Sequence, residues 1–514
     1  MSKTIIIIGA GLAGLSAALQ AAENGCNVKL VSSLPSERAQ SVMAEGGINA
    51  ALNTKDENDS PEEHFTDTIK AACGLADPNA VWGMTQAAPE LVHWLLKLGV
   101  KFNMSGYDDV DLRNFGGQKK KRTAFAQSDT GKQIMTAMID AVRRKEASGM
   151  VERFSHHSFL TLRLCGNICC GCVIRDEYSQ ENVELPGDAV IVATGGMHGL
   201  FGNTTGSLSN TGEVTAELFR LGVPLANGEM IQYHPTTVKC GGKRMLISEA
   251  ARGEGGRLFA MKDGKQWYFM EEKYPELGNL MPRDITAREI WKVSHESEVF
   301  LDMTEISEEI ISNKLSGLVD DCMTYLHKDI RKEPVSVLPG IHYFMGGILV
   351  DEQHRTPIQN LCAAGECCAQ YHGANRLGGN SLLGALYGGR VAAKSACEQA
   401  DVVDLSCATQ IDFPPASQIS EIKQLNKVMQ ETMGVVRNEN TLLNGIKTVQ
   451  ALTGNLPLLG MAVLKSALAR KESRGAHWRE DYPKSNDDDY LKTTVARFDG
   501  KQIQISFVPV PERR

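Results

Sequence analysis

A strand, a glycine-rich turn, a helix and a second strand follow one another within the first 33 residues, and this order constrains the fold most. Residues 5–8 are four isoleucines, which is typical of a strand buried on both faces. Gly9, Gly11 and Gly14 then have the spacing G-x-G-x-x-G, and apolar residues recur afterwards at helical spacing. Residues 27–33, NVKLVSS, form the second strand. In this context the glycines predict a dinucleotide site whose phosphates face the helix N-terminus.

The end of the second strand leaves the identity of the dinucleotide open. A carboxylate commonly stands there and holds a ribose, whereas this chain has Ser32 and Ser33. Serine hydroxyls both donate and accept hydrogen bonds, so these two residues are expected to contact the ribose.

Two later segments are predicted to join the same sheet. DAVIVATGG, residues 188–196, is an apolar strand followed by glycines, and NLCAAGECCAQ, residues 360–370, repeats this pattern. A predicted hairpin, FLTLRL to CCGCVIRD, precedes the first of these strands, as flavin folds commonly have it. Residues 340–395 are therefore expected to rejoin the domain begun at the N-terminus, and two such strands far apart in the sequence favour FAD.

Composition and charge exclude several classes of function. The net charge of -8 argues against nucleic acid as a partner, because phosphate neutralisation needs a basic surface. The basic run KKKR, residues 119–122, is interpreted as a solvated loop. No apolar run reaches the roughly 18 residues of a membrane-spanning helix, and no basic segment precedes the apolar N-terminus as in a signal peptide. We therefore expect a cytoplasmic chain with no membrane span of its own.

The thirteen cysteines are interpreted as reduced thiols, because nothing in the sequence indicates export. The densest group, CGNICCGC, surrounds a Gly166-Asn167 turn, which predicts a β-hairpin. Because side chains alternate along a strand, Cys169 and Cys172 are expected to point to opposite faces. A closed zinc site needs further ligands on one side, so no metal site is predicted.

Histidines and arginines flanked by glycines gather between residues 230 and 380. Each has a structural explanation on its own, such as a turn histidine or a surface ion pair between Arg283 and Asp284. Together they suggest a dianionic ligand held beside a flavin. The set comprises His234, Ser248, Glu249, Arg252, Arg283, His342 and Arg376.

The motifs resemble those of the flavoprotein subunits of fumarate reductase and succinate dehydrogenase, a superfamily that includes L-aspartate oxidase. The resemblance runs from IIIIGAGLAG through AEGGINAAL, YHPT, SEAARGEGG, PRD and HYFMGG to HGANRLGGNSLL and ESRGAHWREDYP, and covers nearly the whole chain. It implies an α/β fold, with a Rossmann-like FAD-binding domain that is interrupted by an α+β capping domain and followed by a helical domain. The implied boundaries are 1–227 and 340–400 for the FAD-binding domain, 228–339 for the capping domain, 401–480 for the helical domain and 481–514 for a C-terminal segment.

The resemblance also implies a reaction and a set of roles. Flavin N5 gives a hydride to one alkene carbon of fumarate, and an arginine protonates the other carbon. By motif, Arg283 is the implied proton donor, with Glu249 and Arg252 as its relay. The residues implied to hold or line the dicarboxylate are Phe115, His234, Ser248, His342, Arg376 and Gly47.

The same resemblance assigns FAD contacts to the glycine-rich turn, to the loop after the second strand and to the later strands. The segment TGEV departs from the family's TGDG at Glu213 and Val214. The implied contacts are Gly9, Ala10, Gly11, Leu12, Ala13, Gly14, Ser32, Ser33, Gln40, Ser41, Met43, Ala44, Glu45, Gly46, Gly47, Ser158, Ala193, Thr194, Gly195, Glu213, Glu366, Arg376, Asn380, Ser381 and Leu382.

Gln40 bears on how the cofactor is held. It stands where membrane-bound relatives, in the pattern RSHTVAAEGG, carry a histidine that bonds covalently to the flavin. An amide has no nucleophilic imidazole nitrogen, so the resemblance implies non-covalent FAD. Because the covalent bond resembles a device for raising the flavin potential, its absence favours fumarate reduction. Gly46 and Gly47 are expected to let the backbone approach the isoalloxazine ring.

Three alternatives stay open at this point. L-aspartate oxidases share SEAARGEGG but typically carry a glutamate where this chain has Phe115, and an apolar ring cannot pair with a substrate ammonium. A reductase of the same fold would act on another 2-enoate. A non-catalytic flavin scaffold would not need Glu249, Arg252 and Arg283 together.

Partners follow from the resemblance alone. The relatives usually dock on an iron-sulfur protein, sometimes with a membrane anchor, and no four cysteines of this chain have ferredoxin-like spacing. An iron-sulfur subunit or a soluble donor is therefore expected to reduce the FAD, with membrane association only through partner subunits.

Overall fold

The computed structural model describes residues 2–106, 109–399, 411, 413 and 418–514. Its central feature is a five-stranded parallel sheet in which β1 pairs with β2 on one side and with β10 on the other. The prediction that residues 188–196 and 360–370 join the sheet begun at the N-terminus is therefore confirmed. In sheet order the strands are β20 (Leu361–Ala363), β10 (Ala189–Val192), β1 (Thr4–Ile8), β2 (Asn27–Ser32) and β6 (Val151–Ser155).

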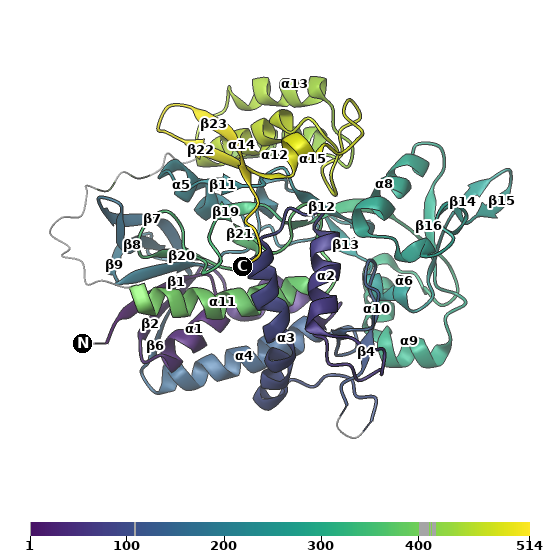
Figure 1. Cartoon of the computed structure of the whole chain (residues 1–514), viewed down its shortest axis with the longest axis horizontal. Helices are drawn as coiled ribbons and strands as arrows, with labels where there is room; N and C mark the ends of the chain where they lie inside the picture. Colours follow the sequence, from purple (N-terminus) through teal and green to yellow (C-terminus); the bar gives the residue numbers. More distant parts are fainter. Residues whose placement is uncertain (1, 107–108, 400–410, 412, 414–417) are drawn as a thin grey trace.

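Helices cover one face of this sheet and a smaller sheet covers the other. Isoleucines 5 and 7 pack with the helices, whereas isoleucines 6 and 8 pack with the smaller sheet, so the run of four is buried on both sides. Figure 1 shows the helices beneath the strands. They are α1 (Leu12–Glu23), α4 (Thr130–Ala147) and α11 (Asn380–Gln399), and the smaller sheet is β7 (His157–Cys165), β8 (Ile168–Asp176) and β9 (Asn182–Pro186).

The predicted cysteine hairpin is present, but one expectation about it is wrong. Leu164 pairs with Cys169 and the next residue back, Arg163, pairs with Gly171, so Cys170 is a bulge in β8. A bulge shifts the alternation of side chains by one residue. Cys169 and Cys172 therefore lie in the same buried cluster instead of on opposite faces. Within the described residues no group of metal-ligating side chains is present.

The interpretation of residues 119–122 as a solvated loop holds for the lysines and is wrong for Arg122. Arg122 is fully buried and donates two hydrogen bonds to Asp59, at 2.8 and 3.1 Å. A second carboxylate, Asp67, lies 3.0 Å away. Two carboxylates offset the cost of burying the guanidinium, so this charge belongs to the fold and not to the surface.

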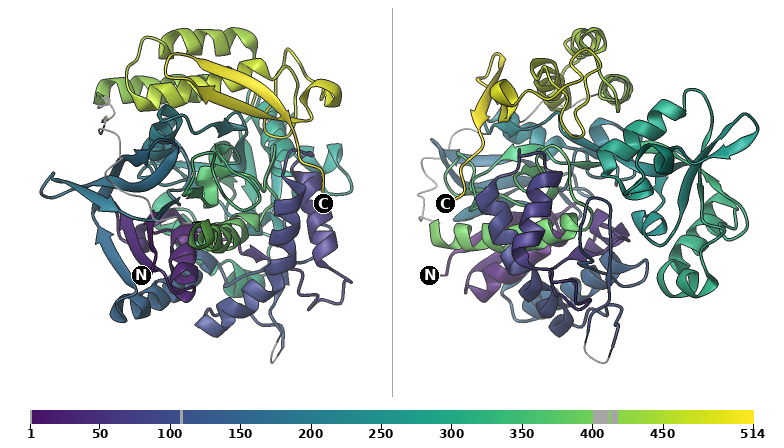
Figure 2. Two further views of the ribbon diagram at one scale, coloured as in Figure 1. Left: turned by 60° about the vertical axis from the view of Figure 1, so that its left-hand side comes forward. Right: turned by 45° about the vertical axis from the view of Figure 1, so that its right-hand side comes forward.

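A second group of elements forms a lobe at the side of the molecule, here called the side lobe (residues 243–337). It has a hydrophobic cluster of its own, and Figure 2 shows it projecting from the main body. β12 (Ile231–Cys240) and β18 (Leu338–Phe344) lead into and out of it and pair with each other. The elements of the lobe are β13 (Lys243–Leu246), α6 (Glu249–Gly253), β14 (Arg257–Lys262), β15 (Lys265–Trp267), α7 (Phe269–Lys273), α8 (Arg283–Val293), β16 (Val299–Asp302), α9 (Glu308–Lys314), α10 (Ser316–Asp321) and β17 (Val335–Ser336).

The C-terminal part returns to the main body. Its last two strands, β22 (Lys492–Phe498) and β23 (Ile503–Pro509), extend a five-stranded sheet through the pairing of β22 with β11 (Leu225–Ala226). The other two strands of that sheet are β19 (Gly347–Leu349) and β21 (Cys368–Ala369). Three helices, α12 (Ile419–Thr432), α13 (Glu439–Val449) and α14 (Asn455–Ala469), pack beside it.

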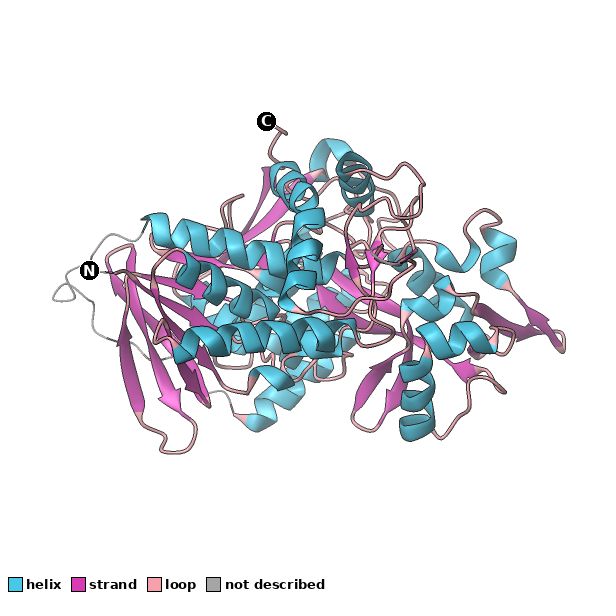
Figure 3. Cartoon of the chain, turned by 90° about the horizontal axis from the view of Figure 1, so that it is seen from below, coloured by secondary structure: helices cyan, strands magenta, loops and turns pink. Residues whose placement is uncertain are grey.

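Figure 3 shows the molecule from below, coloured by secondary structure, with the side lobe again extending outward. The helical domain was predicted to begin at residue 401, but residues 401–410, 412 and 414–417 lie outside the described residues. The predicted domain boundaries therefore stay predictions. Among the described helices, none has the length and apolarity needed to cross a membrane.

The contact between α1 and α11 gives a test of the fold. A Cβ added at Gly389 of α11 would overlap the Ala13 carbonyl oxygen of α1, whereas a Cβ at Gly384 would lie 3.3 Å from the Tyr371 ring. We expect Gly389→Ala to lower the free energy of unfolding by about 1–3 kcal/mol, because overpacking forces the two backbones apart. Gly384→Ala, on the same helix, is the matched control and should melt close to the wild type in a thermal denaturation. A Gly389→Ala protein as stable as the control would contradict the close contact.

Candidate active site

The glycine-rich turn has the geometry of a phosphate-binding turn. Gly9 has a φ of +112°, and a Cβ at Gly14 would overlap the Gly9 carbonyl oxygen. Gly11 is the N-cap of α1 and has no side chain that could cap the helix. The first backbone N–H groups of α1 have no acceptor within the helix. The predicted contacts Ala10, Leu12 and Ala13 lie in the same turn and first helical residues. The turn therefore suits a pyrophosphate at the helix N-terminus.

The loop after β2 lies against this turn. Ser41 accepts a hydrogen bond from the Leu12 N–H at 3.3 Å. The Ala44 carbonyl accepts one from the Gly131 N–H at 2.7 Å, at the start of α4. Gln40 and Met43 stand in a short 3-10 turn whose side chains reach the surface, and Met43 is 62% exposed. The structure thus brings the predicted loop residues beside the glycine-rich turn.

The two glycines of this loop are required by protein neighbours. A Cβ at Gly46 would lie 3.0 Å from the Phe115 ring. Gly47 has a φ of +131°, and its Cβ would lie 2.5 Å from the Ala124 carbonyl oxygen. The expectation that Gly46 and Gly47 make room for a flavin ring stays a prediction, because the contacts seen are with Phe115 and with β5 (Thr123–Ala124).

Other predicted cofactor residues gather at the carboxyl ends of the parallel strands. Ala193, Thr194 and Gly195 follow β10, and Ser381 and Leu382 begin α11. The side chain of Asn380, by contrast, is already used within the protein. It accepts from Asn49 at 2.7 Å, contacts a His64 ring nitrogen at 2.9 Å and donates to Thr68 at 3.0 Å. These contacts position Asn380 at the start of α11, and its predicted contact with FAD stays a prediction.

Ser32, Ser158 and Glu213 are predicted cofactor residues that come from β2, β7 and the first position of a short helix, respectively. Ser32 pairs in register with Ser155 of β6, and its hydroxyl is buried without a partner. Ser158 donates to the Glu177 carboxylate, and burial together with Glu177 raises the pKa of Glu213. Ser33 is exposed beside Ser32. The unpartnered Ser32 hydroxyl fits the ribose predicted from the sequence.

Glu366 is placed by the backbone and by a histidine. Its carboxylate accepts from the Phe344 N–H at 3.1 Å and lies 3.6 Å from His198 Nε2. A Cβ at Gly196 would lie 2.7 Å from the same carboxylate, so the glycine after β10 lets it approach the strand end.

Arg283 and Glu249 form a buried pair, as the motifs predict. Arg283 Nε donates to Glu249 Oε2 at 2.7 Å, and an Nη nitrogen lies 2.5 Å from the same oxygen. The other carboxylate oxygen accepts from the Gly116 N–H at 3.1 Å and faces Arg252 at 3.4 Å. Burial raises the pKa of Glu249, but Arg283 and Arg252 outweigh it and the net shift is downward. Glu249 is therefore a carboxylate at neutral pH.

A third group, Gln232, also holds Arg283. Its amide oxygen accepts from Arg283 at 3.1 Å, and its amide nitrogen donates to the Arg376 carbonyl at 2.8 Å. Sequence reasoning missed this residue. Gln232 stands two positions before His234 on β12, and the period of two along a strand was the signal that could have found it.

The two predicted histidines face each other. The rings of His234 and His342 are 5.1 Å apart and close to perpendicular. Burial, then Arg283, lowers the pKa of both well below the usual histidine range, so both rings are neutral at pH 7. His234 Nε2 is buried without a hydrogen-bond partner. His342 Nδ1 hydrogen-bonds the Thr205 hydroxyl at 2.8 Å, a contact between distant segments that no sequence pattern signals.

Arg376 completes the set from the main body. Its guanidinium lies 4.4 Å above the Tyr343 ring, and its Nε is buried without a partner. No carboxylate forms an ion pair with it among the residues described. Burial, then Arg283, lowers the pKa of Arg376 to about 9.

Phe115 and Ser248 close the site from two sides. Phe115 is buried within the hydrophobic cluster of the side lobe. Ser248 is the N-cap of α6, and its hydroxyl accepts from the Ala250 N–H at 3.4 Å. It also contacts the Glu45 carboxyl, whose pKa burial and Asp321 raise to about 8. Glu45, in the loop after β2, thus touches the side lobe. This contact was not predicted.

The residues present fit FAD in this place. The turn at Gly9 packs closely against the backbone at Ala193, which leaves the N-terminus of α1 without side chains, and the buried hydroxyl of Ser32 and the buried guanidinium nitrogen of Arg376 lack protein partners. Buried polar atoms are nearly always satisfied in folded proteins, so their orphaned state indicates a polar ligand.

Comparisons with known proteins agree with this geometry. A family model described as an FAD binding domain matches residues 4–382, and a model of the fumarate reductase flavoprotein C-terminus matches residues 452–513. The succinate dehydrogenase flavoprotein subunit of Bacillus subtilis is 38% identical over 100% of this chain and 98% of its own. The 8-methylmenaquinol:fumarate reductase flavoprotein subunit of Wolinella succinogenes is 32% identical over 100% and 92%.

Solved structures show the same relationship. A variant of the FrdA subunit of Escherichia coli quinol fumarate reductase superposes with a TM-score of 0.90 at 27% identity, covering 99% of this chain and 97% of that one. The predicted fold class and the prediction of FAD are confirmed by these matches. The chain therefore belongs to the family of succinate dehydrogenase and fumarate reductase flavoprotein subunits.

Proposed function

We propose that this chain, with FAD bound non-covalently, reduces fumarate to succinate. The observation that carries the proposal is an excess of buried cations converging on one place. Arg283 and Arg252 share one carboxylate, Glu249, and Arg376 has no ion pair among the described residues. A dianion supplies the missing charge, because buried charges need partners.

The carboxylates of fumarate are expected to lie between the two halves of the site. His234, His342 and Arg376 come from β12, β18 and the segment before α11, whereas Ser248 and Arg283 come from the side lobe. Neutral imidazoles donate hydrogen bonds without adding charge, and the arginines supply the attraction. Holding both carboxylates fixes the double bond against the flavin groove, and such positioning supplies much of the rate.

FAD, when bound and reduced, supplies the hydride that the alkene needs. Arg283 is proposed to give a proton to the other alkene carbon and to regain one through Glu249, which touches it, with Arg252 next in line. Gln232 and Glu249 hold the guanidinium from two sides, so its donating N–H is fixed in direction. The proposed capping domain, residues 228–339, carries Arg283 and excludes water when closed.

The direction of the reaction is part of the proposal. The relatives include both succinate dehydrogenase and fumarate reductase flavoproteins, so their names favour neither direction. Gln40 supports fumarate reduction, because it takes the place of the histidine that bonds covalently to the flavin in membrane-bound relatives. Phe115, buried against Gly46, supports a substrate without an amine.

We propose that the chain works with an iron-sulfur partner. The matching relatives are named as subunits, and the described cysteines form no metal-binding group. This partner is proposed to pass electrons to the FAD.

Substrate turnover and two variants test the function together. The purified protein should reduce fumarate with reduced viologen as donor and should not turn over aspartate with oxygen. Arg283→Ala and Arg283→Lys should each lose about 100-fold or more of this activity while the FAD spectrum is kept, since general acid catalysis contributes about that much. Arg257→Ala, which removes a half-exposed arginine of the same lobe, is the control and should stay active. Near-normal fumarate reduction by both Arg283 variants, or preferred turnover of aspartate, would reject the proposal.

Removal of the cofactor tests the mode of attachment. After acid precipitation, the flavin absorbance should appear in the supernatant, because the Gln40 amide forms no covalent bond to FAD. The measurement is the visible spectrum of both fractions, with the pellet digested by protease before it is read. Flavin that stays on peptides in the pellet would show covalent attachment.

Thr205 provides a test of substrate binding. Thr205→Val keeps the shape of the side chain but leaves His342 Nδ1 without its 2.8 Å partner. We expect about a tenfold rise in KM for fumarate with a smaller change in kcat, since an unsatisfied buried group costs about 1–3 kcal/mol. Thr205→Ser restores the hydroxyl and should restore KM. If serine and valine behave alike, the hydrogen bond does not orient His342.

A further inference from the structure

Two cysteines far apart in the sequence meet at the C-terminal ends of α1 and α11. Cys26 follows the end of α1, and Cys397 lies in the last turn of α11. Their Sγ atoms are 3.0 Å apart, although 371 positions separate them along the chain. A disulfide bond is about 2.04 Å long, so a movement of about 1 Å would join them.

We propose that Cys26 and Cys397 form a disulfide when the protein meets a low-molecular-weight disulfide such as oxidised glutathione. Nothing in the proposed reaction uses either thiol. The pair is therefore a modification site separate from the active site, and it does not depend on which substrate the enzyme reduces.

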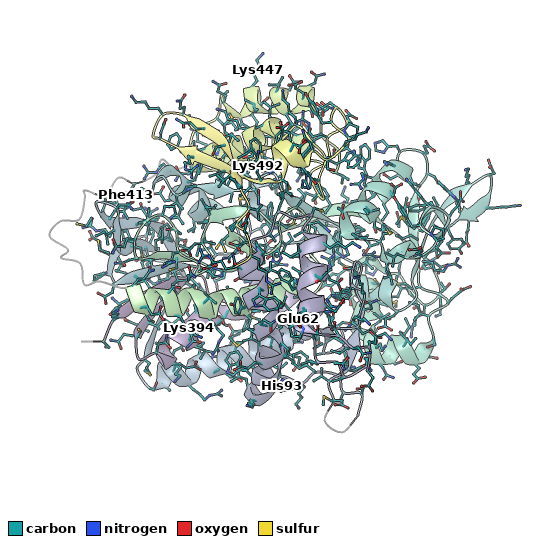
Figure 4. The ribbon with its side chains drawn as sticks, in the orientation of Figure 1. Glu62, His93, Lys394, Phe413, Lys447 and Lys492 are labelled. Carbon is teal, nitrogen blue, oxygen red and sulfur yellow. The ribbon has the colours of Figure 1, made fainter. Side chains whose placement is uncertain are left out.

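Both backbones are fixed around the pair. The Cys26 N–H donates to the Ala21 carbonyl at 3.0 Å, which closes the end of α1. Lys3 Nζ donates to the Cys397 carbonyl at 2.7 Å, at the end of α11. Figure 4 labels Lys394, one turn before Cys397, near this end of α11. The two sulfurs therefore need only the small movement given above to bond.

Access differs between the two sulfurs and sets the order of steps. Cys26 is only 4% exposed, whereas Cys397 is partly exposed. The Cys397 thiolate attacks one sulfur of the small disulfide, forms a mixed disulfide and releases one thiol. The Cys26 thiolate then attacks Cys397 Sγ and releases the second thiol. Two electrons and two protons pass from the cysteine pair to the oxidant, which leaves as two thiols.

Burial and the local charges make the attack of Cys397 on the small disulfide slow at neutral pH. Burial, then the neighbouring Cys26, raises the pKa of Cys397 to about 12. Both thiols also lie at helix C-termini, where a negative charge is disfavoured. Lys3 and Asn24 act in the opposite direction but do not outweigh these effects. Because the thiolate is the nucleophile, the rate should rise about tenfold per pH unit up to that pKa.

The disulfide would cross-link the C-terminal ends of α1 and α11. The N-termini of these helices are the glycine-rich turn and the residues Ser381 and Leu382, which are predicted to face FAD. A cross-link that closes so long a loop stabilises the folded state by restricting the unfolded chain. Oxidation should therefore raise the melting temperature.

The experiment uses the full-length protein with FAD. It is incubated with oxidised glutathione at pH 7 and pH 9, the remaining thiols are alkylated, and a non-reducing digest is analysed by mass spectrometry. We expect one peptide pair joining Cys26 to Cys397, a thiol count two lower than in the untreated protein, and faster formation at pH 9. The melting temperature should rise with the same time course.

Variants separate this site from other thiols. Cys26→Ser and Cys397→Ser should each abolish the cross-link and the rise in melting temperature, and Cys26→Ala replaces the serine variant if that protein does not fold. Cys240→Ser removes a half-buried cysteine elsewhere and should behave as the wild type. A Cys397 that stops at the mixed disulfide, a cross-link between other cysteines, or no cross-link at either pH would overturn the proposal.

Discussion

The close approach of α1 to its neighbours is the contact on which the rest of the site depends. Gly14 lets the helix backbone meet the turn at Gly9, and Gly389 lets α11 meet α1 at Ala13. Any side chain at these positions would push the helices off the sheet. Because the helices stay close, their N-termini and the carboxyl ends of β1 and β10 converge. The loop after β2, strand β20 and Glu366 are arranged around that convergence.

Charge divides the substrate site between two parts of the molecule. Arg283, Glu249 and Arg252 belong to the side lobe, whereas Arg376 and His342 belong to segments that lead back to the parallel sheet. The neutral histidines add no charge, so the imbalance comes from the arginines. The proposed dianion would contact both parts and hold them together, which would link substrate binding to the position of the lobe. Gln232 contributes to this link, since it touches both Arg283 and the Arg376 backbone.

Sequence reasoning predicted what repeats along the chain and missed what depends on distant partners. The isoleucine run and the glycine spacing located the sheet and α1, since strand and turn chemistry are local. The bulge at Cys170 was missed because a one-residue shift in the pairing of two strands does not change which amino acids the strands contain. Burial of Arg122 depends on Asp59 and Asp67, more than 50 positions earlier, and the contacts of Asn380 with His64 and Thr68 likewise join distant segments. Gln232 could have been found from strand alternation, whereas Thr205 could not.

The pairing of β22 with β11 has a consequence for synthesis on the ribosome. Leu225 and Ala226 leave the ribosome long before Val495 and Ala496, their partners in the sheet. Until residues 492–509 emerge, β11 presents an unpaired edge on that side, and such edges favour association between nascent chains. A late part of this chain therefore covers a surface of an earlier part.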